Sequence, residues 1–361
     1  MKKIFLTAAA LTVGTLAQAQ SSITLYGTAD VYVESLKVSG KSADTRLTSG
    51  GLAPSKWGMR GSEDLGGGLK AVFHLESGFA IDSGAVSGAM FSRAANVGLT
   101  SPVWGEVRLG RQNAPMNDAM VWTDTDWASN FSANSPLLLN NDPVAGLYHL
   151  RQSNLISYTS PLLNGFDAKL AFGPGESTPL NAAGTVTARN TFGAMLRYKS
   201  GPLLTTAALH RGGQNTPTGA NKQAAYNLAA RYDFGPLTLS GDYYQSQTKL
   251  ASGAEPKLQA AVVGMLVPQG AWAYVAQYGY VKDNGLNIAG VAKGKGTSEL
   301  FNVGAHYFVS KRTILYTRLA KAMDSGNGFN GQSANAGIAF GGAVPVNGSA
   351  RTLAVGVYHS F

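Results

Sequence analysis

Apolar and polar residues alternate with a period of two along much of this chain. From Ile23 to Val33 one parity is apolar or small, and the other parity carries Thr, Tyr and Asp. The same alternation returns in residues 226–234, 237–244, 272–280 and 351–361. Successive side chains of a strand point to opposite faces, and segments of about 10 residues are long enough to cross a bilayer as tilted strands. The pattern predicts membrane-spanning strands with lipid on one face and water on the other.

Residues 351–361 (RTLAVGVYHSF) show this alternation most clearly. From Leu353 onward one face is apolar except for His359, and the other face is small or polar. The apolar side chains of the first face are Leu353, Val355, Val357 and Phe361. We expect this face to contact lipid and the opposite face to contact water.

Short and long connections alternate between the predicted strands. Long polar stretches include 38–54, 173–189, 212–221 and 324–349, and we expect eight of them. An even number of strands closes an antiparallel sheet without unpaired edges, as lipid requires. Short turns then belong on the periplasmic side and long loops outside. We expect seven short turns, at 63–68, 101–105, 162–165, 200–202, 234–236, 267–270 and 310–311. Seven short turns and eight long loops connect 16 strands. The predicted fold class is therefore an all-β, transmembrane, up-and-down barrel of 16 strands.

The first 19 residues have the features of a secretory signal peptide. Lys2 and Lys3 precede a short apolar stretch, and Ala17-Gln18-Ala19 has the small-x-small pattern that signal peptidase recognises. The apolar stretch is too short for a membrane anchor, because a spanning helix needs about 20 predominantly apolar residues. We therefore expect cleavage of residues 1–19 and a single mature domain over residues 20–361.

Composition and charge agree with an exported barrel. Charged residues make up 14% of the chain, whereas about 25% is usual for soluble domains. The chain has no Cys, so disulfides, thiolate nucleophiles and Cys-based metal sites are excluded. The net charge is +9, and loss of Lys2 and Lys3 lowers it to +7. This basic excess includes no Lys/Arg block or basic helix, so we expect no binding to nucleic acid.

Several segments resemble the Gram-negative general porins, particularly those of beta-proteobacteria. They are SSITLYG at 21–27, KWGMRGSEDLGGGLKA at 56–71, GEVRLGRQ at 105–112, NLISY at 154–158 and the terminal Phe361. The resemblance implies a homotrimer of 16-stranded barrels in the outer membrane, each with its own pore. It also implies a third loop folded into the barrel as a constriction. Phe361 and its strand are then the expected signal for the outer-membrane assembly machinery.

Residues 112–149 are the expected constriction loop. A polar segment of this length within a compact domain is usually functional or disordered, and Trp122, Trp127 and Phe131 argue against simple disorder. An external loop with incidental acids is the alternative. The acids expected at the constriction are Asp118, Asp124, Asp126 and Asp142.

A basic wall should face these acids. The resemblance places Lys56, Arg93 and Arg151 in the row of cations opposite the third loop. Lys56 replaces the more usual Arg, which keeps the charge and loses the planar fork. Parity directs Lys56 and Arg60 to the same inward face, whereas the sequence around Arg93 assigns no face. Arg111, at the mouth of the loop, is a further candidate.

These features predict passive diffusion of water, ions and small hydrophilic solutes through a general porin. Because rings of Arg or Lys favour anions, we expect a modest anion preference. Crowding of the third-loop acids at the narrowest point would remove or reverse it. The external loops are expected to contact lipopolysaccharide, and the apolar wall to contact outer-membrane lipid.

Two other classes of function were weighed. An enzyme needs a nucleophile and a base within hydrogen-bond reach, but the five His residues are scattered and the chain has no GxSxG, HExxH or Walker pattern. No cofactor or metal site is expected. A substrate-specific channel or a surface adhesin remains open as an alternative. A sugar channel would need an aromatic track, for which the candidates are Tyr26, Tyr32, Tyr244, Tyr316 and Tyr358.

Overall fold

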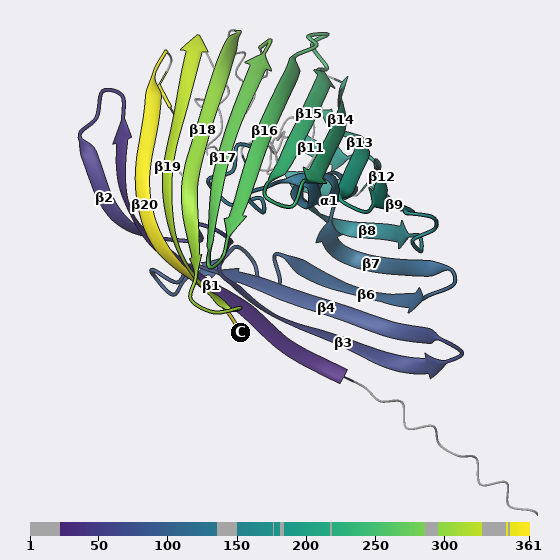
Figure 1. Ribbon diagram of the computed structural model, residues 1–361. Coiled ribbons are helices and arrows are strands. Elements are labelled where there is room, and N and C mark those ends of the chain that lie inside the picture. Colours follow the sequence, from purple (N-terminus) through teal and green to yellow (C-terminus); the bar gives the residue numbers. More distant parts are fainter. Residues whose placement is uncertain are drawn as a thin grey trace, which may run out of the picture.

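The computed structural model describes residues 22–135, 150–175, 177–180, 184–216, 219–285, 295–326, 344–345 and 347–361 (Figure 1). Residues 1–19, with the expected signal peptide, lie outside these ranges. Within them, sixteen strands form the wall. In order of pairing they are β1 (Ser22–Val38), β3 (Lys56–Gly66), β4 (Leu69–Phe79), β6 (Ala94–Ser101), β7 (Gly105–Asn113), β8 (Arg151–Thr159), β9 (Phe166–Gly173), β12 (Thr191–Ser200), β13 (Leu203–Thr216), β14 (Gly219–Asp233), β15 (Thr238–Lys249), β16 (Lys257–Gln269), β17 (Trp272–Asp283), β18 (Gly296–Phe308), β19 (Thr313–Gly326) and β20 (Ser349–Ser360).

Each wall strand pairs antiparallel with the next, and the sheet closes between β20 and β1. Residues 28–38 of β1 pair with β20, while residues 22–28 pair with β3 on the other edge. This ring confirms the predicted 16-stranded antiparallel barrel. In the described part of the chain no helix has the length and apolar character needed to cross a membrane.

The seven predicted short turns are confirmed, and the predicted alternation of short and long connections holds except between β13 and β14, since β13 ends at Thr216 and β14 begins at Gly219. Seven short ones among the described residues join β3–β4, β6–β7, β8–β9, β12–β13, β14–β15, β16–β17 and β18–β19. Four additional strands lie in the long connections: β2 (Ala43–Ser49), β5 (Val86–Ser87), β10 (Ser177–Leu180) and β11 (Gly184–Ala188).

The prediction of a long loop at 212–221 is wrong. The structure places residues 212–216 in β13 and 219–221 in β14, and their pairing continues to Thr216 opposite Gly219. Polar residues do not end a strand when it extends beyond the bilayer, because an antiparallel ladder needs only backbone groups. The polar composition of this stretch therefore marks where the strands leave lipid, not where they end.

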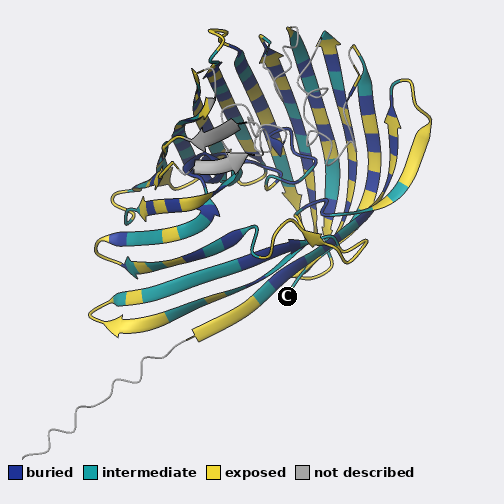
Figure 2. Cartoon of the chain, turned by 180° about the vertical axis from the view of Figure 1, so that it is seen from behind, coloured by how far each residue is buried: buried dark blue, intermediate teal, exposed yellow. Residues whose placement is uncertain are grey.

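Exposure alternates along the wall as the sequence predicted (Figure 2). On β20 the exposed fractions of Leu353 and Val355 are 56% and 60%, whereas Ala354 between them is fully buried. Many large apolar side chains on other wall strands are similarly exposed on the outer parity, which is the face that lipid covers.

A helix, α1 (Pro115–Thr123), follows β7 and contacts β9 and β12–β15. It begins after Ala114 with Pro at its first position, where the missing N–H costs no hydrogen bond. Its buried Met116 and Met120 form one apolar cluster with wall residues including Met195 and Tyr244. Farther along the segment, Phe131 packs at a ring-centroid distance of 5.2 Å from Tyr32 of β1. The segment 114–135 therefore contacts the buried face of many strands.

The seam of the barrel depends on a glycine. The N–H of Gly27 donates to the carbonyl of Phe361 at 3.0 Å, and the N–H of Phe361 donates to the carbonyl of Gly27 at 3.1 Å. A Cβ atom at position 27 would overlap the Phe361 ring and lie 2.8 Å from the carbonyl oxygen of Lys56. The lack of a side chain at position 27 therefore lets the terminal aromatic ring lie over β1.

We expect Gly27→Val to impair closure of the barrel, because the new side chain would occupy the position of the Phe361 ring. The measurement is the fraction of heat-modifiable folded protein on gels after refolding. Ala29→Val, two residues farther along the same face, is the control and should refold normally. Equal folded fractions for the two variants would contradict this view of the seam.

Candidate functional site

A cavity of about 280 Å³ lies between the wall strands β3 to β9 and the beginning of α1. Alternation along the strands directs charged side chains into it from several strands at once. Its lining includes five cations and three carboxylates: Lys56, Arg93, Arg108, Arg151, Lys169, Glu76, Glu106 and Asp118. We refer to it as the basic cavity. With all eight groups ionised it carries a net charge of +2.

Glu76 on β4 connects the cations at one side of the basic cavity. Arg93 Nε donates to Glu76 Oε1 at 2.6 Å, and Lys56 Nζ lies 3.6 Å from Oε2. The Tyr26 hydroxyl of β1 also donates to Oε2, at 2.8 Å. One carboxylate therefore holds two cations in fixed positions and leaves an excess of positive charge.

Arg151, the first residue of β8, is half-buried in the same cavity. Its guanidinium has no hydrogen-bond or ion-pair partner in the described part of the chain. The charges of Arg93 and Arg111 disfavour its positive charge, and the charges of Glu76 and Asp118 favour it. Because neither carboxylate pairs with the guanidinium directly, an anion from solution is a suitable additional counter-charge.

Asp118 in the first turn of α1 is the third-loop acid that reaches the basic cavity. Lys169 Nζ of β9 donates to Asp118 Oδ2 at 2.6 Å and to the carbonyl of Asn113 at 3.0 Å. Asn113 Nδ2 donates to the other carboxylate oxygen at 3.2 Å. Lys169 therefore neutralises the acid.

The other predicted cations lie in different places. Arg60 shares a neighbouring cavity of about 550 Å³ with Lys56, and its guanidinium carbon is 5.3 Å from the Tyr26 ring centroid. Arg111 is absent from the lining of both cavities. The pairing of β7 with β8 shifts register between Gly110 and Gln112, so Arg111 leaves the alternation. Its Nη1 donates to Ser153 Oγ at 3.0 Å.

Asp126 is buried against the wall and does not line the basic cavity. Arg318 Nη2 of β19 donates to Asp126 Oδ1 at 2.7 Å, and Asn302 Nδ2 of β18 donates to Oδ2 at 2.8 Å. The side chains of Asp126 and Arg318 are both fully buried. A buried carboxylate needs such partners, so this residue attaches the segment to the wall.

Asp124 makes a second attachment. Gln277 Nε2 of β17 and the N–H of Asp126 each donate to Asp124 Oδ1 at 2.7 Å. Burial, together with the charge of Asp126, raises the pKa of Asp124 to about 6, although the accepted hydrogen bonds oppose the shift. Asp142, the fourth predicted acid, lies outside the described residues. The structure thus separates the three acids that it describes into one cavity-lining group and two buried anchors.

The predicted site did not include four of the charged lining residues: Glu76, Glu106, Arg108 and Lys169. Glu76 shares a strand face with His74, which the alternation alone could have placed inside the barrel. Lys169 sits on a short strand, and its link to Asp118 is a tertiary contact without a local sequence signal.

Comparisons with known proteins agree with this architecture. A family model described as "Gram-negative porin" matches residues 6–327. The chain is 32% identical to outer membrane porin protein 32 of Delftia acidovorans over the full length of both. It is 28% identical to major outer membrane protein P.IB of Neisseria meningitidis, covering 93% of this chain and 98% of that protein.

A solved structure shows the same fold. The anion-selective porin from Comamonas acidovorans superposes with a TM-score of 0.82 at 28% identity, covering 95% of this chain and all of that one. The full-length match in sequence, the closed ring of sixteen strands and the charged cavity inside it are consistent with one another. This chain belongs to the Gram-negative porins of the outer membrane.

Proposed function

We propose that this porin is a general diffusion channel with a modest preference for anions. The observation that carries the proposal is the basic cavity, with five cations, three carboxylates and an unpaired Arg151. Cationic rings at a narrow passage favour anions through their field. The likeness to a solved porin named anion-selective supports the same sign.

Residues 112–149 are the proposed constriction loop, folded into the lumen. Two sets of contacts support this placement: the apolar packing of α1 against β12–β15, and the attachment of Asp124 and Asp126 to β17–β19. Since these two acids are buried in the anchors, they add little negative charge to the passage. Of the three described third-loop acids, Asp118 alone lines the basic cavity, and it is paired with Lys169.

The proposed assembly is a homotrimer. The connection between β4 and β6 exposes Ile81, Val86 and Met90, whose exposed fractions are 38%, 62% and 70%. Clustered exposed apolar side chains often mark protein contacts, so a neighbouring subunit is a suitable cover for them. Cleavage after Ala19, assembly through Phe361 and contact with lipopolysaccharide complete the proposal.

Transport is passive and involves no catalytic step in this proposal. The rival function of a sugar channel needs aromatic rings open to the lumen. Three of the tyrosines considered for such a track, Tyr32, Tyr244 and Tyr316, have exposed fractions of 1% or less. Their burial favours a general channel over a sugar channel with an aromatic track.

We expect Arg151→Gln to lower the ratio of chloride to potassium permeability by about two- to threefold, because the substitution removes one unpaired positive charge from a water-filled passage. The measurement is the zero-current potential of the refolded protein in a planar bilayer across a KCl gradient. Asp118→Asn should raise the ratio. Lys41→Gln, which removes an exposed loop charge, is the control. A cation preference in the unaltered protein would overturn the proposed selectivity, and lack of conductance would overturn the channel function.

We expect Asp126→Asn to loosen the constriction loop, because breaking one partner of a buried ion pair costs about 3–5 kcal/mol. The measurements are single-channel conductance and proteolytic cleavage between residues 124 and 135. Asp44→Asn, on an exposed part of β2, is the control. The pair replacement Asp126→Asn with Arg318→Met should recover part of the attachment, since it leaves no buried charge unpaired. Unchanged conductance and cleavage in Asp126→Asn would contradict the anchor.

The attachment at Asp124 should strengthen as the pH falls. The pKa of Asp124 is about 6 when the segment is attached to the wall, compared with 3.8 for an ordinary Asp. The attached state therefore binds the proton more tightly than the detached state. This contribution is fully present below about pH 4 and is lost as the pH rises through about 6. The protection factors of the amides in residues 124–135, which are exchange rates divided into the intrinsic rates at the same pH, should therefore be higher at pH 5 than at pH 7.5. Asp124→Asn should remove most of that difference, and an unaltered pH dependence in the variant would exclude Asp124 as its source.

A further inference from the structure

A third cavity, of about 690 Å³, lies on the other side of α1 from the basic cavity. It shares no lining residue with the basic cavity. Asp118 in the first turn of α1 faces the basic cavity, whereas Val121 and Trp122 in the last turn face this one. Its remaining walls come from Thr125 and Trp127 of the segment and from the turn-side ends of β12–β16. We refer to it as the tryptophan cavity.

Two indole rings form its aromatic side. Trp127 retains an exposed fraction of 41%, while its ring stacks on His306 at a centroid distance of 4.8 Å and an interplanar angle of 22°. Its φ of +54° lies in the left-handed region, which non-glycine residues rarely adopt. The surrounding contacts therefore hold a large aromatic ring partly open towards water, at a cost in local backbone energy.

Trp122 is the second ring. The Arg197 guanidinium carbon lies 4.2 Å from its ring centroid, and the same guanidinium donates to Asp167 Oδ2 at 2.9 Å through Nε. Because Arg197 is neutralised by Asp167, it fixes the orientation of the indole and contributes little free charge to the cavity.

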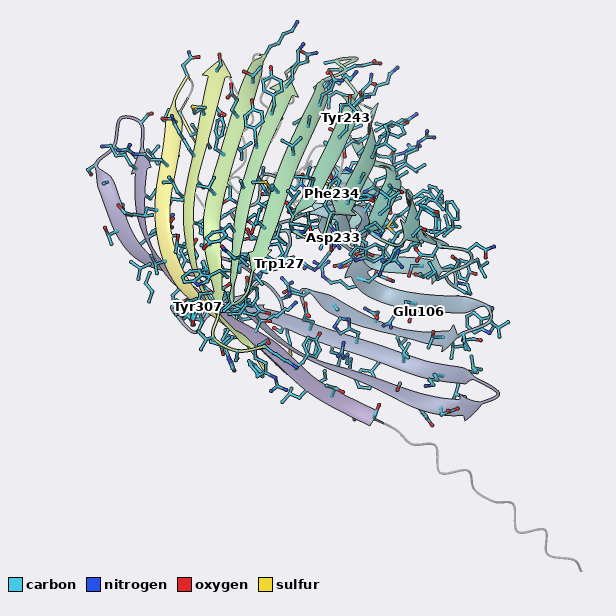
Figure 3. The ribbon with its side chains drawn as sticks, viewed as in Figure 1. Glu106, Trp127, Asp233, Phe234, Tyr243 and Tyr307 are labelled. Carbon is cyan, nitrogen blue, oxygen red and sulfur yellow. The ribbon has the colours of Figure 1, made fainter. Side chains whose placement is uncertain are left out.

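Unpaired positive charge comes from two neighbouring strands. Lys199 near the end of β12 and Arg231 near the end of β14 both line the tryptophan cavity. Neither has a hydrogen-bond or ion-pair partner for its charged group among the described residues. Asp233, labelled with Trp127 in Figure 3, is the one carboxylate in the lining, and its Oδ1 accepts a hydrogen bond from the N–H of Gly235. The cavity thus has two cations available to a ligand.

We propose that the tryptophan cavity is a weak binding site for planar aromatic carboxylates. The indole of Trp127 offers a stacking surface, and Leu204 and Leu266 provide an apolar floor. Lys199 and Arg231 supply the charge that a carboxylate needs. A neutral sugar would leave both cations without a counter-charge, and an inorganic anion would leave the apolar surface in water.

This inference goes beyond general diffusion, because it adds a preferred class of solute on the turn side of the constriction. Binding must be weak for transport to continue, since a channel site has to release what it binds. An aromatic acid that dwells beside Trp127 enriches the passage in that solute without closing it to chloride.

The test is calorimetric titration of the refolded protein in detergent with benzoate, cyclohexanecarboxylate and benzamide. We expect saturable binding of benzoate, several-fold weaker binding of cyclohexanecarboxylate, and no saturable binding of benzamide. Trp127→Leu should weaken benzoate binding by about two- to tenfold, the usual range for one aromatic contact. The double variant Lys199→Gln with Arg231→Gln should weaken it at least as much.

Lys311→Gln, an exposed charge in the β18–β19 turn at the same end of the barrel, is the matched control and should bind benzoate normally. Equal affinity for the aromatic and the saturated carboxylate would overturn the proposal. Normal benzoate binding by the folded double variant would also overturn it. Loss of binding in Arg151→Gln alone would overturn it as well, because that result would place the anion in the basic cavity. Chloride conductance of the same preparation tests the channel function separately, so a conducting protein that ignores benzoate refutes this inference alone.

Discussion

Backbone N–H and C=O groups within a bilayer have no water to bind, so a sheet that lies in lipid must pair all of its edges. Here the last edge is removed by pairing β20 with β1. That pairing joins strands at opposite ends of the described chain, and the bonds between Gly27 and Phe361 complete it. The basic cavity and the tryptophan cavity, which wall strands line, depend on this closure.

Burial inside the ring sets a second constraint, which concerns charge. Asp126 and Arg318 are fully buried, and each compensates the other while Asn302 satisfies a remaining oxygen. Buried carboxylates without such partners would be unstable as charged groups. The wall strands therefore determine which acids of the third loop remain available to solutes and which become attachments. Selectivity follows from this division as much as from the number of acids in the loop.

The sequence was sufficient to predict what depends on local pattern. Alternation gave the lipid-facing side of β20, and the short turns gave the number of strands. Alternation also predicted that Lys56 and Arg60 share a strand face, and both side chains line the same cavity. Three features depended on contacts between distant segments and were not predictable: the extension of β13 and β14 into residues 212–216 and 219–221, the displacement of Arg111 by the irregular pairing of β7, and the burial of Asp124 and Asp126. Each is a property of the partner strand rather than of the segment itself.

The contacts of residues 114–135 divide the circumference of the barrel into two unequal arcs. The segment packs against β9, β12–β15, β17–β19 and Tyr32 of β1, whereas the strands from β3 to β9 carry the cations of the basic cavity. The contacts of this segment are thus concentrated along one arc, and the cations of the basic cavity along the other. With residues 112–149 as the proposed constriction loop, the proposed permeation path is eccentric: it runs beside the cationic strands instead of along the barrel axis, so that a small number of side chains on one arc would act on every ion that passes.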